Sequence, residues 1–276
     1  GTPKRPRSRQ PDHDPRRMLT ILTDLPEALQ AEDQVELYYQ PRIDLASGRC
    51  VAVEALMRWK HPALDWISPG EFFPLVESTA LIKPLTEHVL DTAIRQLGVW
   101  IRSFPDLSVS VNVSPNNLSE PDFVDGLKRL LHAHDVNADR IELEFTEGAV
   151  AADDTTTLVG LRQIRALGAT VAIDDFGSGY SNMAYLTKIP ADIIKIDKGF
   201  VQYVEPSGQS GFLLRKITNL ARGLGFQVVG EGVETTEAYD FLISIGCAQA
   251  QGYRISKPLP VGAITDWLTA HAETPR

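Results

Sequence analysis

The sequence is poor in cysteine and has no long apolar run. Its 276 residues include only two cysteines, Cys50 and Cys247, which excludes a disulfide scaffold and a cysteine-based zinc cluster. No apolar segment approaches the roughly 20 residues that a membrane-spanning helix needs, and no signal peptide is visible. We therefore expect a cytoplasmic globular protein with a core large enough to fold without disulfides. The chain begins with Gly1 rather than Met, which is compatible with a longer protein that has an upstream domain or membrane anchor.

Basic residues are concentrated at the start of an otherwise acidic chain. Residues 1–17 carry a formal charge of +4 and four prolines, whereas the whole chain carries −9. We interpret residues 1–18 as a disordered head or linker, although such a tail could also bind nucleic acid or acidic lipid. Residues 19–276 are expected to form one domain. Its acidity argues against a nucleic acid polymer as partner, and an anionic substrate would need cations between it and the carboxylates.

Short β-rich runs alternate with segments of helical spacing. The helical segments include residues 86–101 and 211–223. This alternation over about 250 residues predicts an α/β fold, a TIM-like (β/α)8 barrel. The loop at 43–49 is too short for a helical crossover, so the first two strands should be antiparallel. The eight predicted strands are 35–40, 51–59, 107–113, 140–145, 169–173, 192–196, 226–229 and 252–255.

Acidic residues lie at the ends of several predicted strands, where barrel enzymes keep their sites. Any one of them could be a surface ion pair or a helix cap, but several buried together require cations. Oxygen ligands without nearby cysteine favour Mg²⁺ or Mn²⁺ over Zn²⁺. The residues concerned are Glu54, Glu144, Glu147, Asp174, Asp175, Glu231 and Glu234, with Asn112 among them.

Lys195 is the basic residue in this group. It could neutralise charge on a transition state, or it could form a structural ion pair with Asp197. The two glycines that follow Asp175 suit a mobile loop or the close approach of a phosphate. The six histidines are scattered without metal-ligand spacing, and we assign them no catalytic role.

From about residue 20 to residue 270 the sequence resembles the EAL-domain family, bacterial phosphodiesterases of cyclic di-GMP. The motifs that carry the resemblance follow in family order and spacing. They are Glu54-Ala-Leu-Met-Arg-Trp, Ser110-Val-Asn-Val-Ser, Glu144-Phe-Thr-Glu, Asp174-Asp-Phe-Gly-Ser-Gly-Tyr-Ser, Ile194-Lys-Ile-Asp, Glu231-Gly-Val-Glu-Thr and Gln251-Gly-Tyr.

The resemblance implies a role for each matching residue. A first metal would be held by Glu54, Asn112, Glu144 and Asp174, and a second by Asp174, Asp175 and Glu231. Lys195 and Gln251 would lie at the attacking water, and with Glu54 and Glu231 they form the implied catalytic set. Substrate contacts would come from Gln40, Arg58, Asn112 and Asp197, with Arg58 at a phosphate. Support for the site and its loop would come from Glu147, Phe176, Gly177 and Glu234.

The implied reaction is hydrolysis of cyclic di-GMP to linear pGpG with two Mg²⁺ or Mn²⁺ ions, and Ca²⁺ is expected to inhibit it. The resemblance also implies a homodimer, and an upstream sensory or GGDEF-type domain. Three positions depart from the family pattern: Gly148, Asn182 and Ala248. None is an implied metal ligand. The resemblance places Gly148 and Asn182 close to the loop that couples dimerisation to metal binding, so these two departures concern regulation and turnover rate and not competence for hydrolysis.

Two other functions fit these residues less well. A receptor that binds cyclic di-GMP without cutting it usually lacks some of the metal-binding acids, all of which are present here. A glycosidase would need two isolated carboxylates and aromatic sugar platforms. The dense acid cluster with one lysine and only four Trp does not fit that pattern.

Overall fold

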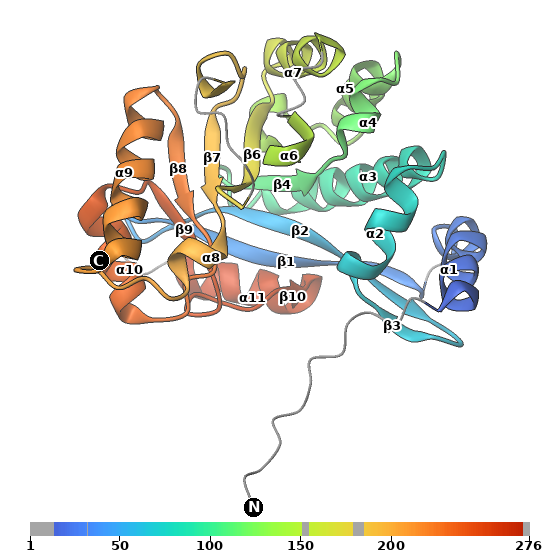
Figure 1. Ribbon diagram of the computed structural model, residues 1–276. Helices are drawn as coiled ribbons and strands as arrows, with labels where there is room; N and C mark the ends of the chain where they lie inside the picture. The colour runs from blue at the N-terminus through green and yellow to red at the C-terminus, as the bar shows by residue number, and fades with distance from the viewer. Residues whose placement is uncertain (1–13, 32, 151–154, 179–184, 273–276) are drawn as a thin grey trace, which may run out of the picture.

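Two long antiparallel strands begin the barrel. The computed structural model describes residues 14–31, 33–150, 155–178 and 185–272, and within them eight strands close on one another (Figure 1). Their order is β1-β9-β8-β7-β6-β5-β4-β2, and β2 pairs back with β1. The barrel strands are β1 (Val35–Asp44), β2 (Cys50–His61), β4 (Ser108–Asn112), β5 (Ile141–Thr146), β6 (Thr170–Phe176), β7 (Ile193–Ile196), β8 (Gln227–Gly230) and β9 (Gln249–Gln251).

The pairing of the first strand is antiparallel on both sides. β1 runs against β2 from Val35 opposite Trp59 to Ile43 opposite Cys50, with an irregularity after Arg42. β1 is also antiparallel to β9, whereas the pairs from β2–β4 around to β8–β9 are parallel. The prediction of an α/β TIM-like barrel with an antiparallel first pair is therefore confirmed. Two short strands, β3 (Asp65–Ile67) and β10 (Leu259–Pro260), extend the sheet beyond the barrel.

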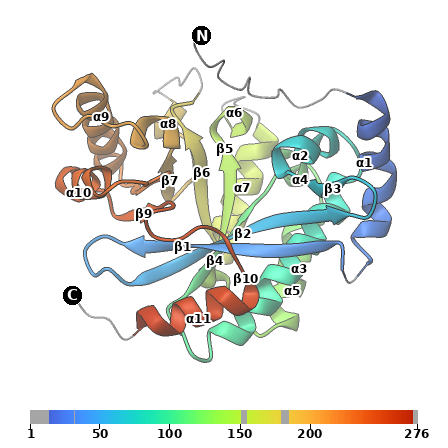
Figure 2. The same cartoon turned by 90° about the horizontal axis from the view of Figure 1, so that it is seen from below.

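Helices surround the strands (Figures 1 and 2). The periodicity over residues 86–101 and 211–223 correctly predicted α3 and α9, each of which begins a few residues earlier than expected. The helices are α1 (Pro15–Ala28), α2 (Pro69–Glu77), α3 (Ile82–Trp100), α4 (Pro115–Leu118), α5 (Phe123–Ala133), α6 (Glu147–Val150), α7 (Thr155–Leu167), α8 (Lys198–Val201), α9 (Gln209–Gly223), α10 (Thr236–Ile245) and α11 (Val261–Ala272), with 3₁₀ turns η1 (Ala138–Arg140) and η2 (Tyr185–Thr187). No helix in these described ranges is both long and apolar enough to cross a bilayer.

The start of the domain differs from the sequence prediction. Helix α1 begins at Pro15, where Asp14 accepts a hydrogen bond from the Arg16 backbone N–H at 2.9 Å. An acidic N-cap followed by proline is a strong helix start. The predicted boundary at residue 18 therefore falls inside a helix, and residues 1–13 of the proposed head lie outside the described residues.

The last barrel strand was also misplaced. Residues 252–255, predicted as a strand, form turns in which the Ile255 N–H donates to the Gly252 carbonyl oxygen. The strand lies just before, at β9. Because Gln249 and Gln251 alternate with Ala250 there, the segment has no apolar run that would have marked it as a strand.

The inside of the barrel is unusually polar. A small apolar cluster of Ala172, Ile193 and Val229 is separate from the large core between strands and helices. Strand residues alternate between these two environments because the side-chain period of a strand is two. The buried polar residues that face one another inside the barrel form the site described below.

A methyl group added at Gly252 should destabilise the protein, because its Cβ would collide with the backbone nitrogen and oxygen of Val233. We expect Gly252→Ala to lower the free energy of unfolding by about 1–3 kcal/mol. Gly223→Ala is the matched control, since a Cβ there meets nothing within 4 Å, and it should be neutral or slightly stabilising. Urea unfolding of both variants checks this, and equal stability of the two would contradict the proposed collision.

Candidate functional site

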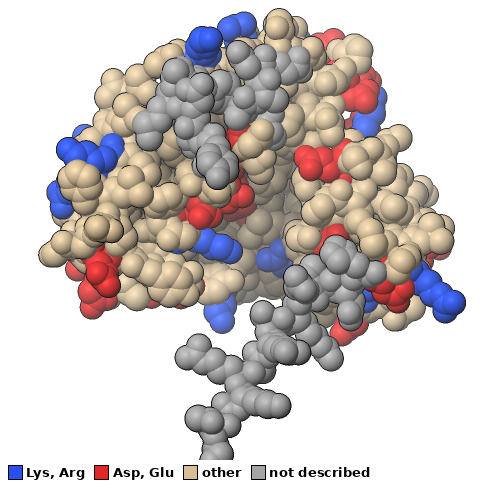
Figure 3. Space-filling view, in the orientation of Figure 1, with Lys and Arg blue, Asp and Glu red and all other residues tan. Residues whose placement is uncertain are grey.

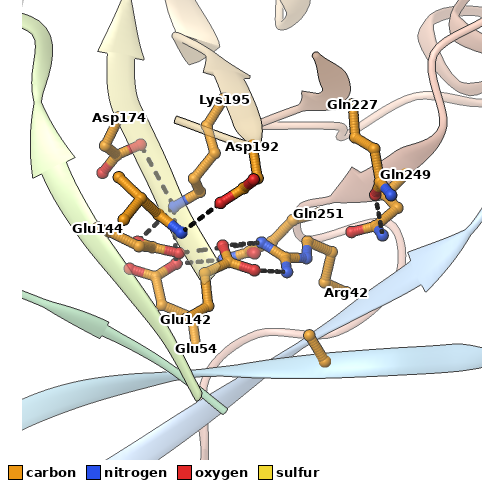
Figure 4. Close-up of polar contacts among 12 residues, drawn as sticks. Arg42, Glu54, Glu142, Glu144, Asp174, Asp192, Lys195, Gln227, Gln249 and Gln251 are labelled. Carbon is orange, nitrogen blue, oxygen red and sulfur yellow. Dashed lines mark hydrogen bonds and ion pairs between the residues drawn. The ribbon is translucent and has the colours of Figure 1, made fainter. Parts of the chain in front are cut away.

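A buried lysine lies at the centre of an acidic cluster. The Lys195 side chain is 0% exposed, and its Nζ contacts carboxylate oxygens from four different segments. Figure 4 shows Lys195 with three of these acids, Glu54, Glu144 and Asp174. The distances are 2.6 Å to Glu144, 2.8 Å to Glu231, 3.2 Å to Asp174 and 3.6 Å to Glu54. Lys195 thus pairs with these four carboxylates and does not form the structural ion pair with Asp197 that was the other interpretation of the sequence.

The strand register brings the acids together. Glu144 and Asp174 lie near the C-terminal ends of neighbouring parallel strands, with Thr146 opposite Asp174. Glu231 follows the last residue of β8, and its N–H donates to the Ile196 carbonyl oxygen. These carboxyl ends meet at one end of the barrel, where acidic atoms lie in a hollow (Figure 3).

Side-chain amides hold Glu54 in place. Asn112 Nδ2 donates to Glu54 Oε1 at 2.8 Å, and Gln251 Nε2 donates to Glu54 Oε2 at 2.5 Å. Gln251 also donates to Gln40 Oε1 at 3.1 Å, and Gln40 donates to the Ser256 carbonyl oxygen at 3.0 Å. Four of the predicted site residues therefore form one hydrogen-bonded chain across β2, β4, β9 and β1.

A second group of acids could hold a cation. Ligand oxygens of Asp174, Asp175 and Glu231 all lie within 4.8 Å of one another. Asp175 has a φ of +54°, an uncommon left-handed conformation for a residue other than glycine. Such strained backbone is concentrated at functional sites.

The donor set fits a hard divalent cation. Glu144 Oε1 and Asp174 Oδ1 are buried and accept no hydrogen bond from the residues that the structure describes, although Asp174 Oδ1 lies near Lys195. Buried carboxylate oxygens normally have partners, so these two acceptors are available to a ligand. Oxygen-only ligands of this kind suit Mg²⁺ or Mn²⁺.

The ionisation of these groups is strongly shifted. Burial raises the pKa of Glu144 well above its ordinary value; Lys195 opposes that shift and Glu54 adds to it. Burial likewise raises the pKa of Glu231 to about 8, despite Lys195. For Glu54, burial raises the pKa, but Lys195 and the two amides outweigh burial and lower it. Burial lowers the pKa of Lys195, and the surrounding carboxylates raise it far more, so the lysine stays charged.

The pKa of Glu231 predicts how stability depends on pH without metal. A folded-state pKa of about 8 against 4.5 means that the fold favours the protonated acid. That stabilisation is complete below pH 4.5 and is lost as pH rises through 8. In EDTA, the free energy of unfolding should fall between about pH 4.5 and 8, by up to about 1.4 kcal/mol per pH unit for one proton, and should level off above pH 8. Glu231→Gln should flatten this decline, whereas exposed Glu237→Gln should not; an unchanged decline in Glu231→Gln would contradict the assignment.

The predicted supporting residues surround the loop after β6. Glu147 Oε2 accepts a hydrogen bond from the Gly177 N–H at 2.8 Å, and Phe176 is buried. Gly177 has a φ of +96°, and a Cβ there would lie 2.6 Å from the Phe200 ring. Asn182 lies outside the described residues.

Three further predicted residues form no ion pair with Lys195 in the part of the chain that the structure describes. Arg58 donates to the Met57 carbonyl oxygen and lies over the Tyr38 ring at 5.4 Å. Asp197 caps α8 by accepting a hydrogen bond from the Gly199 N–H. Exposed Glu234 accepts a hydrogen bond from Gln202. Their predicted roles in substrate binding and support stay predictions.

Two buried charged residues were not predicted from the sequence to belong to the site. Arg42 on β1 and Glu142 on β5 form an ion pair inside the barrel. Each lies two residues from a predicted site residue on its own strand, Gln40 and Glu144. The period of two, which places such residues on the same face, could have found them.

An apolar cavity lies beside the acid cluster. It measures about 310 Å³, and its lining includes Asn112, Asp174 and Asp175 together with Phe73 and Val89. One wall is thus apolar and the other carries the acids. An apolar part of a ligand would pack on the first wall, whereas an anionic part would need a cation between it and the acids of the second.

Comparison with known proteins identifies the family. The EAL domain model matches residues 22–258. The Pseudomonas aeruginosa protein named Cyclic di-GMP phosphodiesterase PA2567 is 40% identical over 258 residues, which are 93% of this chain and 44% of that protein. The Bifunctional diguanylate cyclase/cyclic di-GMP phosphodiesterase MucR of the same organism is 38% identical over 88% of this chain and 35% of its own length. The chain therefore spans less than half the length of these curated relatives.

Solved structures agree with this match. The structure described as "PaMucR Phosphodiesterase, c-di-GMP complex" has a TM-score of 0.82 at 37% identity, covering 89% of this chain and 99% of that one. The EAL enzyme Bd1971 with cAMP and cyclic-di-GMP bound has a TM-score of 0.85 at 29% identity, covering 93% and 70%. With a family model that matches most of its length and this shared barrel, the chain belongs to the EAL domain family.

Proposed function

We propose that this chain hydrolyses one 3′–5′ phosphodiester bond of cyclic di-GMP and releases linear pGpG. The observation that carries the proposal is the buried Lys195 ammonium among four carboxylates at the mouth of an EAL-type barrel. An anionic phosphodiester cannot approach such a cluster without added positive charge. The names of the relatives support this substrate class.

Two Mg²⁺ or Mn²⁺ ions are the proposed cofactors. Five carboxylates, those of Glu54, Glu144, Asp174, Asp175 and Glu231, surround one ammonium. Fully ionised, this group carries a formal charge of −4, which two divalent cations would balance. Glu54, Asn112, Glu144 and Asp174 would hold one ion, and Asp174, Asp175 and Glu231 the other.

The bound ions would supply Lewis acidity toward the attacking water and the phosphate. The chain's own residues then position the reactants. Lys195 Nζ would donate a hydrogen bond that orients the water. Gln251 would lie next to the same water, because it donates a hydrogen bond to Glu54, whose carboxylate also lies near Lys195 Nζ. The water oxygen adds to phosphorus as the bond from phosphorus to the 3′ oxygen breaks; the water loses a proton and the leaving 3′ oxygen gains one, so that a 5′-phosphate and a 3′-hydroxyl result.

Other residues would bind the substrate or shape the loop. Arg58 is proposed to contact a phosphate, and Gln40, Asn112 and Asp197 to make the other contacts to the substrate. The hydrogen bond from the Gly177 N–H to Glu147 would support the loop that carries Asp175. The apolar cavity beside Asp174 offers a place for a guanine base.

The wider setting is also proposed. Because the chain spans less than half the length of MucR and PA2567, we propose that a sensory or GGDEF-type domain precedes it. A homodimer, a cytoplasmic site of action and a linker role for the residues before α1 belong to the same proposal.

Incubation of the purified chain with cyclic di-GMP and Mn²⁺, with pGpG followed by chromatography, tests the activity. Metal-dependent pGpG, abolished by EDTA, is the expected result. Tight binding without product would instead support the receptor alternative. Ca²⁺ in place of Mn²⁺ should allow binding with little hydrolysis, because its coordination is larger and looser.

A further inference from the structure

An ion pair crosses the barrel interior next to the acid cluster. Arg42 on β1 and Glu142 on β5 are 2% and 3% exposed, and their strands are not neighbours in the sheet. Arg42 Nη1 donates to Glu142 Oε1 at 2.7 Å, and Nη2 bonds to Oε2, so the contact is bidentate (Figure 4). This geometry uses both outer nitrogens of the guanidinium on one carboxylate.

The same guanidinium is close to a proposed metal ligand. Arg42 Nη1 lies 3.9 Å from Glu144 Oε1, an oxygen that receives no hydrogen bond from any described residue. The other oxygen, Glu144 Oε2, bonds to Lys195 at 2.6 Å. Glu142 and Glu144 lie on one face of β5, two residues apart, and thus compete for one guanidinium.

Stability alone explains this pair poorly. Burying two charges costs desolvation energy that their attraction only partly returns, and apolar replacements of similar volume are often as stable. An arginine in this place without Glu142 would have Glu144 as its nearest carboxylate. It would then draw Glu144 away from the cation site.

We propose that Glu142 is a positioning residue, which occupies the guanidinium of Arg42 and thereby leaves Glu144 available to a divalent cation. This inference rests on the metal site of the proposed function. Residues that orient metal ligands typically change metal affinity or activity about 10–100-fold when they are mutated.

Titration calorimetry with Mn²⁺ tests the proposal. Glu142→Gln should weaken Mn²⁺ binding about tenfold or more, because Arg42 turns to Glu144. Adding Arg42→Met to Glu142→Gln should restore the dissociation constant to within about threefold of the unmodified chain, since the competing cation is gone. At saturating Mn²⁺, the kcat of Glu142→Gln should recover, with little change in KM for cyclic di-GMP.

Two further variants complete the test, one as a control and one as a replacement if Glu142→Gln does not fold. Glu71→Gln breaks another arginine–carboxylate pair, that of Arg17 with Glu71 outside the cluster, and should leave Mn²⁺ affinity unchanged. If Glu142→Gln does not fold, Glu142→Asp shortens the carboxylate and should weaken Mn²⁺ binding about threefold.

The outcomes separate the two proposals. Unchanged Mn²⁺ affinity in folded Glu142→Gln or Glu142→Asp, or a double variant as weak as the single one, overturns the positioning role. An unmodified chain without Mn²⁺ binding overturns the metal site and this role together. Mn²⁺ binding without hydrolysis contradicts the hydrolase alone, and the affinity series still decides the role of Glu142.

Discussion

Replacement of Asp174 by asparagine is expected to lower the rate of cyclic di-GMP hydrolysis by about 1000-fold or more. Asp174 belongs to both proposed ligand sets, and its carboxylate lies 3.2 Å from Lys195 Nζ. Asparagine has nearly the same shape, so packing is kept while one negative charge and one strong cation ligand are lost. The fold should therefore survive, and Mn²⁺ affinity should fall with activity.

Purified Asp174→Asn should be compared with Asp106→Asn for pGpG formation, Mn²⁺ binding and thermal unfolding. Asp106 is 72% exposed and makes only long ion pairs near 3.9 Å, so its variant should behave as the unmodified chain does. Substantial hydrolysis by folded Asp174→Asn would refute the bridging role. A variant that binds Mn²⁺ normally but does not hydrolyse would confine Asp174 to a role outside metal binding.

Most of the fold could be predicted because the barrel strands are apolar on the side that faces the helices. β6 contains the apolar run Val171–Ile173 and β7 has three isoleucines around Lys195, and the short loop between β1 and β2 left only an antiparallel connection. β9 was misplaced for the opposite reason. Two of its three residues are glutamines that face the polar interior, so hydrophobicity gave no signal there.

The residues of the candidate site could be named from the sequence, but their contacts with one another could not. The motifs named Glu54, Glu144, Asp174 and Lys195 because charged side chains at the ends of apolar strands are costly without a function. Which carboxylate bonds to which partner depends on three-dimensional register, which sequence spacing does not encode. Arg42 was not predicted for a related reason: its partner Glu142 is 100 residues away in the sequence, on a strand that does not adjoin β1.

Replacement of Lys195 by methionine should reduce kcat about 100-fold or more and leave KM for cyclic di-GMP nearly unchanged. Methionine fills the fully buried space left by the lysine, and only the ammonium is removed. Without that charge, the four carboxylates around Nζ lose their shared partner. In EDTA we therefore expect lower thermal stability, and Mn²⁺ should restore it by supplying the missing positive charge.

The test is steady-state kinetics of Lys195→Met at saturating Mn²⁺, together with unfolding in EDTA and in Mn²⁺. Lys216→Met on α9 is the control, because Lys216 is exposed and lies over the Phe212 ring, away from the cluster. A raised KM with an unchanged kcat would place Lys195 in substrate binding and overturn its role at the attacking water. Loss of kcat that persists after Mn²⁺ has restored stability would assign the ammonium to the chemical step, because charge balance alone would then be satisfied by the cation.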